Sequence, residues 1–362
     1  MKKLLAVILC CMMLLSVTAC SEKSAQKSET SSADTAENTT VVITDEMKEK
    51  MDKGLDKINF EGIICITHNG EIVYESITGE DEKGNALTLE SPMFVGSVSK
   101  QFCATAIMML KEQGKLSVDD KLEKYFPEFE NGKDITLKNL LTMRSGICEF
   151  NFADEVNDDS SEQEILDSMK KYVFSQELEF EPDSKNEYRN TNYILLSDVV
   201  EQVSGMSYND FVRENIFTPL GMSDSGFASE VTDSPFYSQY LTLDTLHGGY
   251  VEATVARGAG DIVTTAPDME KWMTGLSCGK LISKEGYAEM TTNYSNDSAY
   301  AYGYALQGAY SSGWSHTGRI GTYTAYDYMN PQEGYNLFAV TNKDNMQLAS
   351  LPFMMLGDLI EG

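Results

Sequence analysis

The sequence is poor in basic residues and has no apolar segment long enough to form a stable membrane span. It contains 56 aspartates and glutamates against 28 lysines and arginines, which gives a formal net charge of −28. Such a domain is repelled by phosphate backbones and by anionic lipid surfaces. We therefore expect no nucleic-acid partner, and no internal repeat is visible that would indicate a solenoid.

Cysteines are also too few and too scattered to form a metal site. Beyond residue 20 there are four: Cys65, Cys103, Cys148 and Cys278. They lack the spacing of metal ligands, and Cys65 and Cys103 lie in apolar segments where a cysteine behaves as a small buried hydrophobe. A disulfide among the four is possible outside the cell, but the sequence indicates no pairing.

The first twenty residues predict export. Lys2 and Lys3 precede an apolar segment at residues 4–15, which small residues follow. This is the order of a secretory signal, and the segment is too short for a transmembrane helix. Residues 17–20 resemble a bacterial lipobox, in which Cys20 becomes the lipidated first residue; an ordinary signal peptide cleaved near Ala19 is the alternative. We predict a signal peptide over 1–19 and a location on the extracytoplasmic face of the cell membrane.

The next segment predicts a tether. Residues 20–45 are rich in serine, threonine, alanine, glutamate and lysine, and they cannot bury enough apolar surface to fold. As a flexible chain they would reach roughly 25–30 Å from the lipid on Cys20. The remaining residues, 46–362, are long enough for a large core, and we expect one monomeric domain.

Strand patterns occur at both ends of this domain and helical patterns between them. Asn69-Gly70 separates two β-rich segments, which is a strong hairpin signal. The expected strands are 62–68, 71–76, 302–306, 313–317, 322–329 and 335–341. The expected helices are 137–143, 162–173, 193–203, 208–216, 267–276 and 346–360. The fold class is therefore α/β (α+β): one antiparallel sheet made from N- and C-terminal strands, flanked by helices, with a mostly helical insertion at about 115–255.

A serine and a lysine three residues apart mark a candidate nucleophile. Ser97 and Lys100 stand where an expected strand turns into a long apolar helix, so both side chains lie on one helix face. A lysine held in an apolar site can lose its proton and accept one from the serine hydroxyl. Three other matches to S-x-x-K lack this setting, and they are Ser24/Lys27, Ser168/Lys171 and Ser277/Lys280.

Two further motifs supply candidate partners. Tyr188 and Asn190 form a Y-x-N motif before an expected helix; the phenol could relay a proton and the amide could bind substrate. His316 and Gly318 form an H-x-G motif at a strand end, where glycine lets a substrate approach the backbone. Both patterns recur elsewhere in the chain. His68 belongs to an expected hairpin and His247 to an expected irregular loop.

In this order, S-x-x-K, Y-x-N and H-T-G resemble the motifs of the serine β-lactamase and penicillin-binding-protein superfamily. The chain is most similar to its class C β-lactamase-related serine hydrolases. Other segments that resemble family signatures lie at 94–97, 135–142 with 145–146, 201–208, 219–222 and 258–261.

The resemblance implies a role for each motif residue. Ser97 would be the acyl-accepting nucleophile, with Lys100 as its base or charge partner. Tyr188 would shuttle the proton and Asn190 would hold the substrate amide. His316 would occupy the third-motif position, and the oxyanion hole would consist of the backbone N–H groups of Ser97 and Arg319. No metal or organic cofactor is implied.

Departures from the family pattern bear on the substrate. A lysine is common where this chain has His316, which is mostly neutral at pH 7; Arg319 next to it could supply the missing charge. The resemblance thus implies a serine hydrolase acting on amides or esters such as D-amino-acid peptides derived from peptidoglycan. A true β-lactamase and a penicillin-binding sensor with little turnover are the alternatives. Arg144 and Asp183 also depart from the family pattern, and we interpret both as structural.

Overall fold

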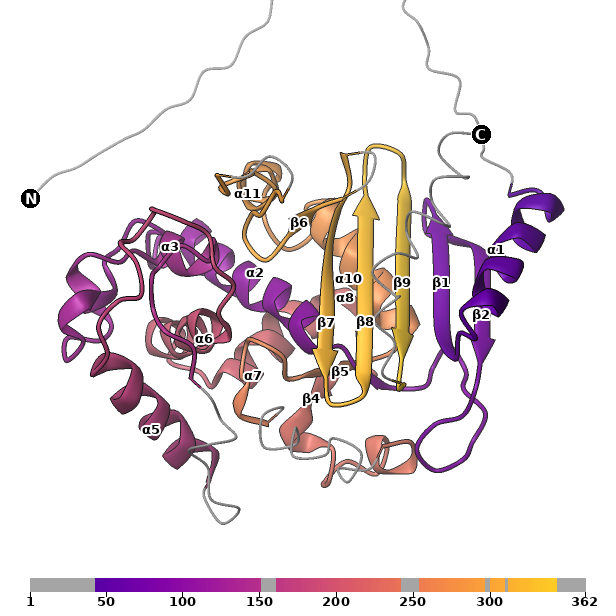
Figure 1. The fold of residues 1–362 in the computed structure, drawn as a ribbon, viewed down its shortest axis with the longest axis horizontal. Helices are drawn as coiled ribbons and strands as arrows, with labels where there is room; N and C mark the ends of the chain where they lie inside the picture. The colour runs from indigo at the N-terminus through magenta and orange to yellow at the C-terminus, as the bar shows by residue number, and fades with distance from the viewer. Residues whose placement is uncertain (1–42, 151–160, 242–253, 297–299, 310–311, 344–362) are drawn as a thin grey trace, which may run out of the picture. The chain divides into compact units, whose positions relative to one another are not determined.

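The computed structural model of the chain describes residues 43–150, 161–241, 254–296, 300–309 and 312–343. Its centre is a six-stranded antiparallel sheet with the strand order β2-β1-β9-β8-β7-β6 (Figure 1). The strands are β1 (Gly62–His68), β2 (Glu71–Thr78), β6 (Gln307–Gly308), β7 (Trp314–Ile320), β8 (Tyr323–Asn330) and β9 (Tyr335–Thr341). A second sheet of three short strands has the order β3-β5-β4, made by β3 (Met93–Phe94), β5 (Ile262–Thr264) and β4 (Gly226–Phe227).

Strands from the two ends of the domain complete the large sheet, which confirms the predicted fold class. β1 pairs with β9 in a register that sets Ile63 opposite Val340. The hairpin between β1 and β2 turns at Asn69 and Gly70, which have φ values of 52° and 84°. Two successive positive φ values are what a two-residue hairpin requires, and this explains the Asn-Gly pair.

The two faces of the sheet bury different residues. Along β1, Ile63 and Cys65 join the large core, whereas Ile64 and Ile66 join a smaller one. This alternation is the period of two expected for a strand covered on both sides. The smaller core is closed by Met51 and Leu55 of helix α1 (Asp45–Lys57), one turn apart on the same face.

Helix α1 was not predicted. It begins after Thr44, whose side chain accepts a hydrogen bond from Met47 N at 3.2 Å, and it has Asp45 and Glu46 in its first turn. Both features are typical of a helix N-terminus. Near the start of the described residues, this helix covers the outer strands of the sheet (Figure 1).

The region between β3 and β7 is mainly helical. Its α-helices are α2 (Ser99–Glu112), α3 (Leu137–Leu141), α5 (Glu162–Phe174), α6 (Asn190–Ser204), α7 (Tyr208–Val212), α8 (Thr218–Leu220), α10 (Ala266–Ser277) and α11 (Lys284–Met290). Short helical turns are η1 (Gly96–Val98), η2 (Leu122–Lys124), η3 (Glu130–Lys133), η4 (Arg213–Phe217), η5 (Ala228–Glu230) and η6 (Tyr237–Gln239). The predicted helix 208–216 is divided, because η4 continues α7 as a π-helical turn.

One predicted strand is wrong. Residues 302–306 form a tight turn, in which Gly303 N donates to Leu306 O at 2.7 Å and Ala305 has a φ of 56°. Only Tyr302 makes a strand-like bridge, to Gln307. The alternating aromatic residues of this segment therefore reflect burial in the core and not a strand.

Some predictions fall on residues that the structure does not describe. They are the signal peptide, the lipid site at Cys20, most of the tether, His247 and the C-terminal helix at 346–360. Within the described ranges, no helix combines the length and the apolar character needed to cross a lipid bilayer.

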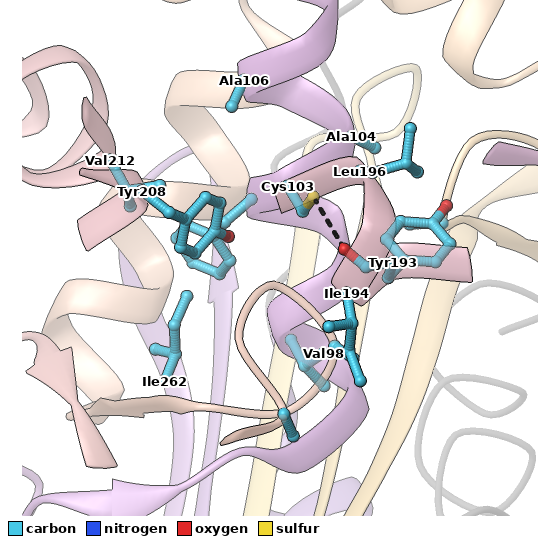
Figure 2. Packing of buried hydrophobic residues seen from close by; sticks show 14 of the residues in the cluster. Val98, Cys103, Ala104, Ala106, Tyr193, Ile194, Leu196, Tyr208, Val212 and Ile262 are labelled. Carbon is cyan, nitrogen blue, oxygen red and sulfur yellow. Dashed lines mark hydrogen bonds between the residues drawn. The ribbon is translucent and has the colours of Figure 1, made fainter. Parts of the chain in front are cut away.

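Helix α2 is the centre of the large core. It is apolar on nearly all sides, as expected for a helix that other elements surround. Phe102 stacks on Trp272 of α10 at 3.7 Å between ring centroids, and Cys103 Sγ lies 3.7 Å from Tyr193 O of α6 (Figure 2). The described cysteines are free, so no disulfide links these elements. These contacts therefore hold the first residues of α2, from Ser99 onward, in a fixed position between the sheet and the other helices.

Replacing Phe102 by alanine is expected to reduce the free energy of unfolding by about 3–5 kcal/mol, because it removes a fully buried ring and leaves a cavity. Ile72→Ala on β2 is the matched control, since the Ile72 side chain is 52% exposed and its loss should change stability little. Urea denaturation followed by tryptophan fluorescence or circular dichroism measures both. Equal losses for the two variants would contradict the central role of α2.

Candidate active site

Ser97 lies in η1, between β3 and α2, as the sequence predicted. Its side chain is partly exposed, whereas Gly96 and Val98 on either side are buried. Gly96 has a φ of 51°, in the left-handed region that glycine adopts most easily. This residue lets the backbone turn sharply out of β3, and the turn presents the Ser97 hydroxyl at the surface of a cavity.

Lys100 is completely buried and contacts Ser97 directly. The Lys100 Nζ atom lies 3.0 Å from Ser97 Oγ. Nζ also donates to Asn190 Oδ1 at 2.7 Å and to the carbonyl oxygen of Ala259 at 2.6 Å. The lysine thus joins three segments that are distant in the sequence: the start of α2, the start of α6 and the loop before β5.

These contacts suit a lysine that exchanges a proton with serine. A neutral amine has two N–H donors and one lone pair. Two of its partners here, an amide oxygen and a carbonyl oxygen, can only accept hydrogen bonds. If they take the two N–H groups, the lone pair is left for the Ser97 hydroxyl. Once protonated, the amine can donate its third N–H to Ser97 Oγ without moving.

Tyr188 lies beside the pair. The Lys100 Nζ atom is 4.8 Å from the centroid of the Tyr188 ring. The buried phenol oxygen has no hydrogen-bond partner among the described residues. Burial raises the pKa of Tyr188, although the neighbouring Ser97 hydroxyl acts to lower it. The phenol therefore stays protonated at neutral pH and can donate a proton.

His316 is a buried, neutral group on β7. Its Nδ1 lies 2.5 Å from the Thr317 carbonyl oxygen, which can only accept, so Nδ1 carries the ring proton. Nε2 faces the Tyr302 hydroxyl at 3.5 Å. Burial, and then the charge of Lys100, lower the pKa of His316 to about 3. The third-motif position therefore presents no cation at neutral pH.

A buried polar network connects the start of α2 with the large sheet. Gln101, next to Lys100, donates to both carboxylate oxygens of Asp327 on β8, at 3.0 and 2.8 Å. Asp327 also accepts from His316 N at 2.7 Å, and Trp272 donates to the Gln101 side-chain oxygen at 2.9 Å. Burial raises the pKa of Asp327 to about 7. The network ties α2 to β7 and β8 at the level of the candidate nucleophile.

The backbones of β7 and η1 lie against one another. A Cβ atom at Gly318 would come within 1.8 Å of the Val95 carbonyl oxygen and 3.1 Å of Ser97 N. A Cβ atom at Gly96 would come within 2.6 Å of Arg319 N. The amide nitrogens of Ser97 and Arg319 therefore belong to two backbones in close contact, as an oxyanion hole made of both would require.

A cavity of about 340 Å³ opens at Ser97. The residues that line it are Ser97, Tyr188, Tyr300, Gln307, His316, Thr317, Gly318, Arg319, Thr324 and Ala325. Ser97, Tyr188, His316, Gly318 and Arg319 were predicted site residues, and Asn190 reaches them through Lys100. Tyr300, Gln307 and the Ala259 carbonyl were not predicted. Ala259 lies in the family-like segment 258–261, but no local pattern indicates that its carbonyl group contacts Lys100.

Those competing motif matches that fall within the described residues lie away from this cavity. Ser168 and Lys171 are exposed on α5, and Lys280 is exposed beyond the end of α10. His68 ends β1 and packs its ring 4.6 Å from that of Tyr335. Arg144 and Asp183, the two other departures from the family pattern, pair with each other at 3.1 Å. This ion pair supports a structural role for both.

Comparisons with known proteins agree with the motifs. A family model described as Beta-lactamase matches residues 47–351. A Bacillus subtilis (strain 168) protein named as a penicillin-binding protein, PbpX, is 33% identical over 304 residues, covering 82% of this chain and 75% of that protein. The teichoic acid D-alanine hydrolase of Staphylococcus aureus (strain MRSA252) is 26% identical over 239 residues, covering 65% of this chain and 58% of that protein.

Solved structures share the fold. FmtA from Staphylococcus aureus superposes with a TM-score of 0.74 at 22% identity, covering 88% of each chain. The D-amino acid amidase from Ochrobactrum anthropi SV3 superposes with a TM-score of 0.69 at 22% identity, covering 87% of this chain and 97% of that one. The chain belongs to the Beta-lactamase family and is a serine hydrolase of the β-lactamase and penicillin-binding-protein kind.

Gly318→Ala is expected to slow the reaction of Ser97 with a fluorophosphonate probe by at least about a hundredfold, because the added methyl group must push β7 away from η1. Gly260→Ala is the control: a Cβ atom there meets its nearest neighbour at 3.6 Å, an ordinary contact. The labelling rate and the melting temperature are measured together. A Gly318→Ala variant that reacts as fast as the wild type would contradict the close approach of these backbones.

Proposed function

We propose that the protein forms an acyl-enzyme on Ser97 and hydrolyses esters or amides of D-amino acids. The observation that carries the proposal is the 3.0 Å contact between Lys100 Nζ and Ser97 Oγ at the mouth of a cavity. The buried amine is the group that can take the hydroxyl proton, and Ser97 is the group that an acyl substrate can reach.

The reaction would proceed through two acyl transfers. Ser97 Oγ attacks the substrate carbonyl carbon while its proton passes to Lys100 Nζ. The N–H groups of Ser97 and Arg319 stabilise the oxyanion, an effect worth roughly 10²–10³ in rate for one such donor. The leaving amine or alcohol then receives a proton through Tyr188 as the carbonyl re-forms. Water cleaves the resulting ester, which returns Ser97 to its hydroxyl form.

The buried part of the cavity favours a substrate without a free carboxylate next to the scissile bond; Arg319 also lines the cavity, but it is exposed to solvent, where a charge pair contributes little. His316 is neutral and buried, so it does not replace the cation that a third-motif lysine provides. The rings of Tyr188 and Tyr300 line the same cavity and can face a substrate ammonium group. The overall negative charge of the chain attracts such a cation. A D-alanyl ester with a free amine fits these features, and the staphylococcal relative is named for D-alanine hydrolysis.

Membrane tethering is the second part of the proposal. The order of charged, apolar and small residues before Cys20 supports a lipid on this cysteine, and the polar composition of residues 20–45 supports a flexible tether. The enzyme would then act on the outer side of the membrane, close to envelope polymers that carry D-amino acids.

Labelling of the intact protein tests the acyl-enzyme. We expect a fluorophosphonate to label the wild type and not Ser97→Ala, and D-alanine esters to be hydrolysed at least about tenfold faster than N-acyl-D-alanyl-D-alanine. A factor of ten corresponds to about 1.4 kcal/mol, to which the more reactive ester bond and the absence of the carboxylate both contribute. Mass spectrometry of the labelled protein identifies the modified residue.

Adding penicillin as a further probe of the wild type and of Ser97→Ala distinguishes the alternative functions. Rapid turnover of penicillin would indicate a true β-lactamase, and a long-lived penicillin adduct without ester hydrolysis would indicate a sensor. Equal labelling of the wild type and Ser97→Ala would overturn the assignment of the nucleophile.

Cys20→Ser is expected to shift the protein from the membrane fraction of the producing bacterium to the soluble or secreted fraction, with unchanged activity per molecule. The reason is that the lipid, not the folded domain, would hold the protein at the membrane. Cys278→Ser, at an exposed cysteine of the folded domain, is the control. Continued membrane association of Cys20→Ser would contradict lipidation at this residue.

A further inference from the structure

Glu149 lies at the start of α6 and has four hydrogen bonds there. Its Oε1 accepts from Asn190 N at 3.1 Å and from Asn190 Nδ2 at 2.8 Å. Its Oε2 accepts from the backbone nitrogen and the hydroxyl of Thr191, both at 3.3 Å. Arg189, the residue before the helix, contributes no side-chain cap. Glu149 therefore accepts hydrogen bonds from the free backbone N–H groups in the first turn of α6, where a negative charge is favoured.

The same carboxylate determines which way the Asn190 amide faces. Asn190 Oδ1 points to Lys100 Nζ at 2.7 Å, and Nδ2 points to Glu149 at 2.8 Å. A carboxylate can only accept hydrogen bonds. Rotating the amide by 180° would place its oxygen against this carboxylate and its NH₂ group against the lysine amine. Glu149 thus excludes the orientation in which Asn190 would compete for the lysine lone pair.

We propose that Glu149 is a positioning residue for the Ser97–Lys100 pair, acting through Asn190. This inference rests on the acyl-enzyme proposed above. With Asn190 Oδ1 held toward Lys100, the two N–H groups of the neutral amine have fixed acceptors in Asn190 and Ala259. The lone pair is then left facing Ser97 Oγ. Glu149 also places a negative charge one side chain away from the amine, where it favours the ammonium that forms during acylation.

Several other described helices are capped by a serine or threonine that immediately precedes the helix, as seen at Ser161, Ser207, Thr265 and Ser283. A carboxylate also lies at two of these helix starts, where Glu201 accepts from Tyr208 N and Glu112 accepts from Ser283 N. α6 is capped by a side chain 41 residues earlier in the sequence, and this side chain binds Asn190 as well as the backbone. A simple cap needs no contact with the Asn190 amide, so the extra contact points to the site.

Among the residues that the structure describes, the charged and titratable groups near Glu149 include Arg189, Glu179, Tyr188 and Cys148. Arg189 is directed to Glu179 at 2.6 Å. Glu149 contributes to the raised pKa of Tyr188, after the larger effect of burial, and to the raised pKa of Cys148, after burial and Glu179. The donors bound to Glu149 are neutral amide and hydroxyl groups. The Asn190 side chain thus lies between the Glu149 carboxylate and the Lys100 amine and is hydrogen-bonded to both.

The test compares Glu149→Gln with Glu164→Gln in the full chain. Glutamine keeps the shape of the side chain but loses the charge and one acceptor. We expect E149Q to slow fluorophosphonate labelling of Ser97 by at least about tenfold and to move the acid limb of its pH profile to lower pH. Glu164 caps α5, accepting from Ser161 N at 2.8 Å, in an exposed position. E164Q should label at the wild-type rate with an unchanged profile.

A double-mutant cycle separates positioning from stability. If Glu149 acts through Asn190, adding E149Q to Asn190→Ala will cause little further loss in labelling rate. A cap that only stabilises α6 would give additive losses and an unchanged pH profile, which would overturn the inference. If E149Q does not fold, as judged by circular dichroism, Glu149→Asp replaces it. This variant keeps the charge but withdraws the carboxylate from Asn190, so the rate should fall while the acid limb stays in place.

Two results distinguish the failure of this inference from the failure of the proposed function. If wild-type protein is not labelled at Ser97, the acyl-enzyme is overturned and the role of Glu149 with it. If the wild type is labelled, Ser97→Ala is not, and E149Q matches the wild type in rate and pH profile, only the role of Glu149 is overturned.

Discussion

The buried amine of Lys100 is the interaction on which the rest of the site depends. Burying an ammonium or amine group costs free energy unless its hydrogen bonds are replaced. Here the partners come from η1, from the start of α6 and from the loop before β5. Because no two of these segments are neighbours in the sequence, the lysine amine has all three partners only when α6 and the loop before β5 have packed around the start of α2. The reactive geometry is therefore a product of the whole fold.

Successive residues at the start of α2 face different parts of that fold. Lys100 turns to α6, whereas Gln101 turns to Asp327 in the sheet. Gly96 and Gly318, meanwhile, let two backbones touch where side chains would keep them apart. The N-terminal end of α2 is thus held by α6, by Asp327 of β8 and by the backbone of β7. Such restraint is what keeps a nucleophile, its base and the oxyanion donors in register without a bound substrate.

Sequence patterns predicted those parts of the structure that depend on interactions between residues close together in the chain. The Asn69-Gly70 hairpin, strand β9 and helix α5 follow from turn chemistry and periodicity, and the setting of Ser97 followed from a strand that turns into a helix. Residues 302–306 were misread because aromatic alternation there reflects burial around a turn. The contacts of Lys100 with Ala259 and of Asn190 with Glu149 could not be predicted. They join distant segments, and no local pattern shows which side chain the Ala259 carbonyl group or the Glu149 carboxylate contacts.

The pairing of β1 with β9 has a consequence for the order in which the protein forms. The hairpin of β1 and β2 is made early in synthesis, yet its inner edge stays without a partner until β9 follows, since Ile63 pairs with Val340. Closing so long a loop is entropically expensive and slow. Until then β1 exposes an apolar edge that can pair with other chains. The large sheet can therefore form only after the chain has been made through β9.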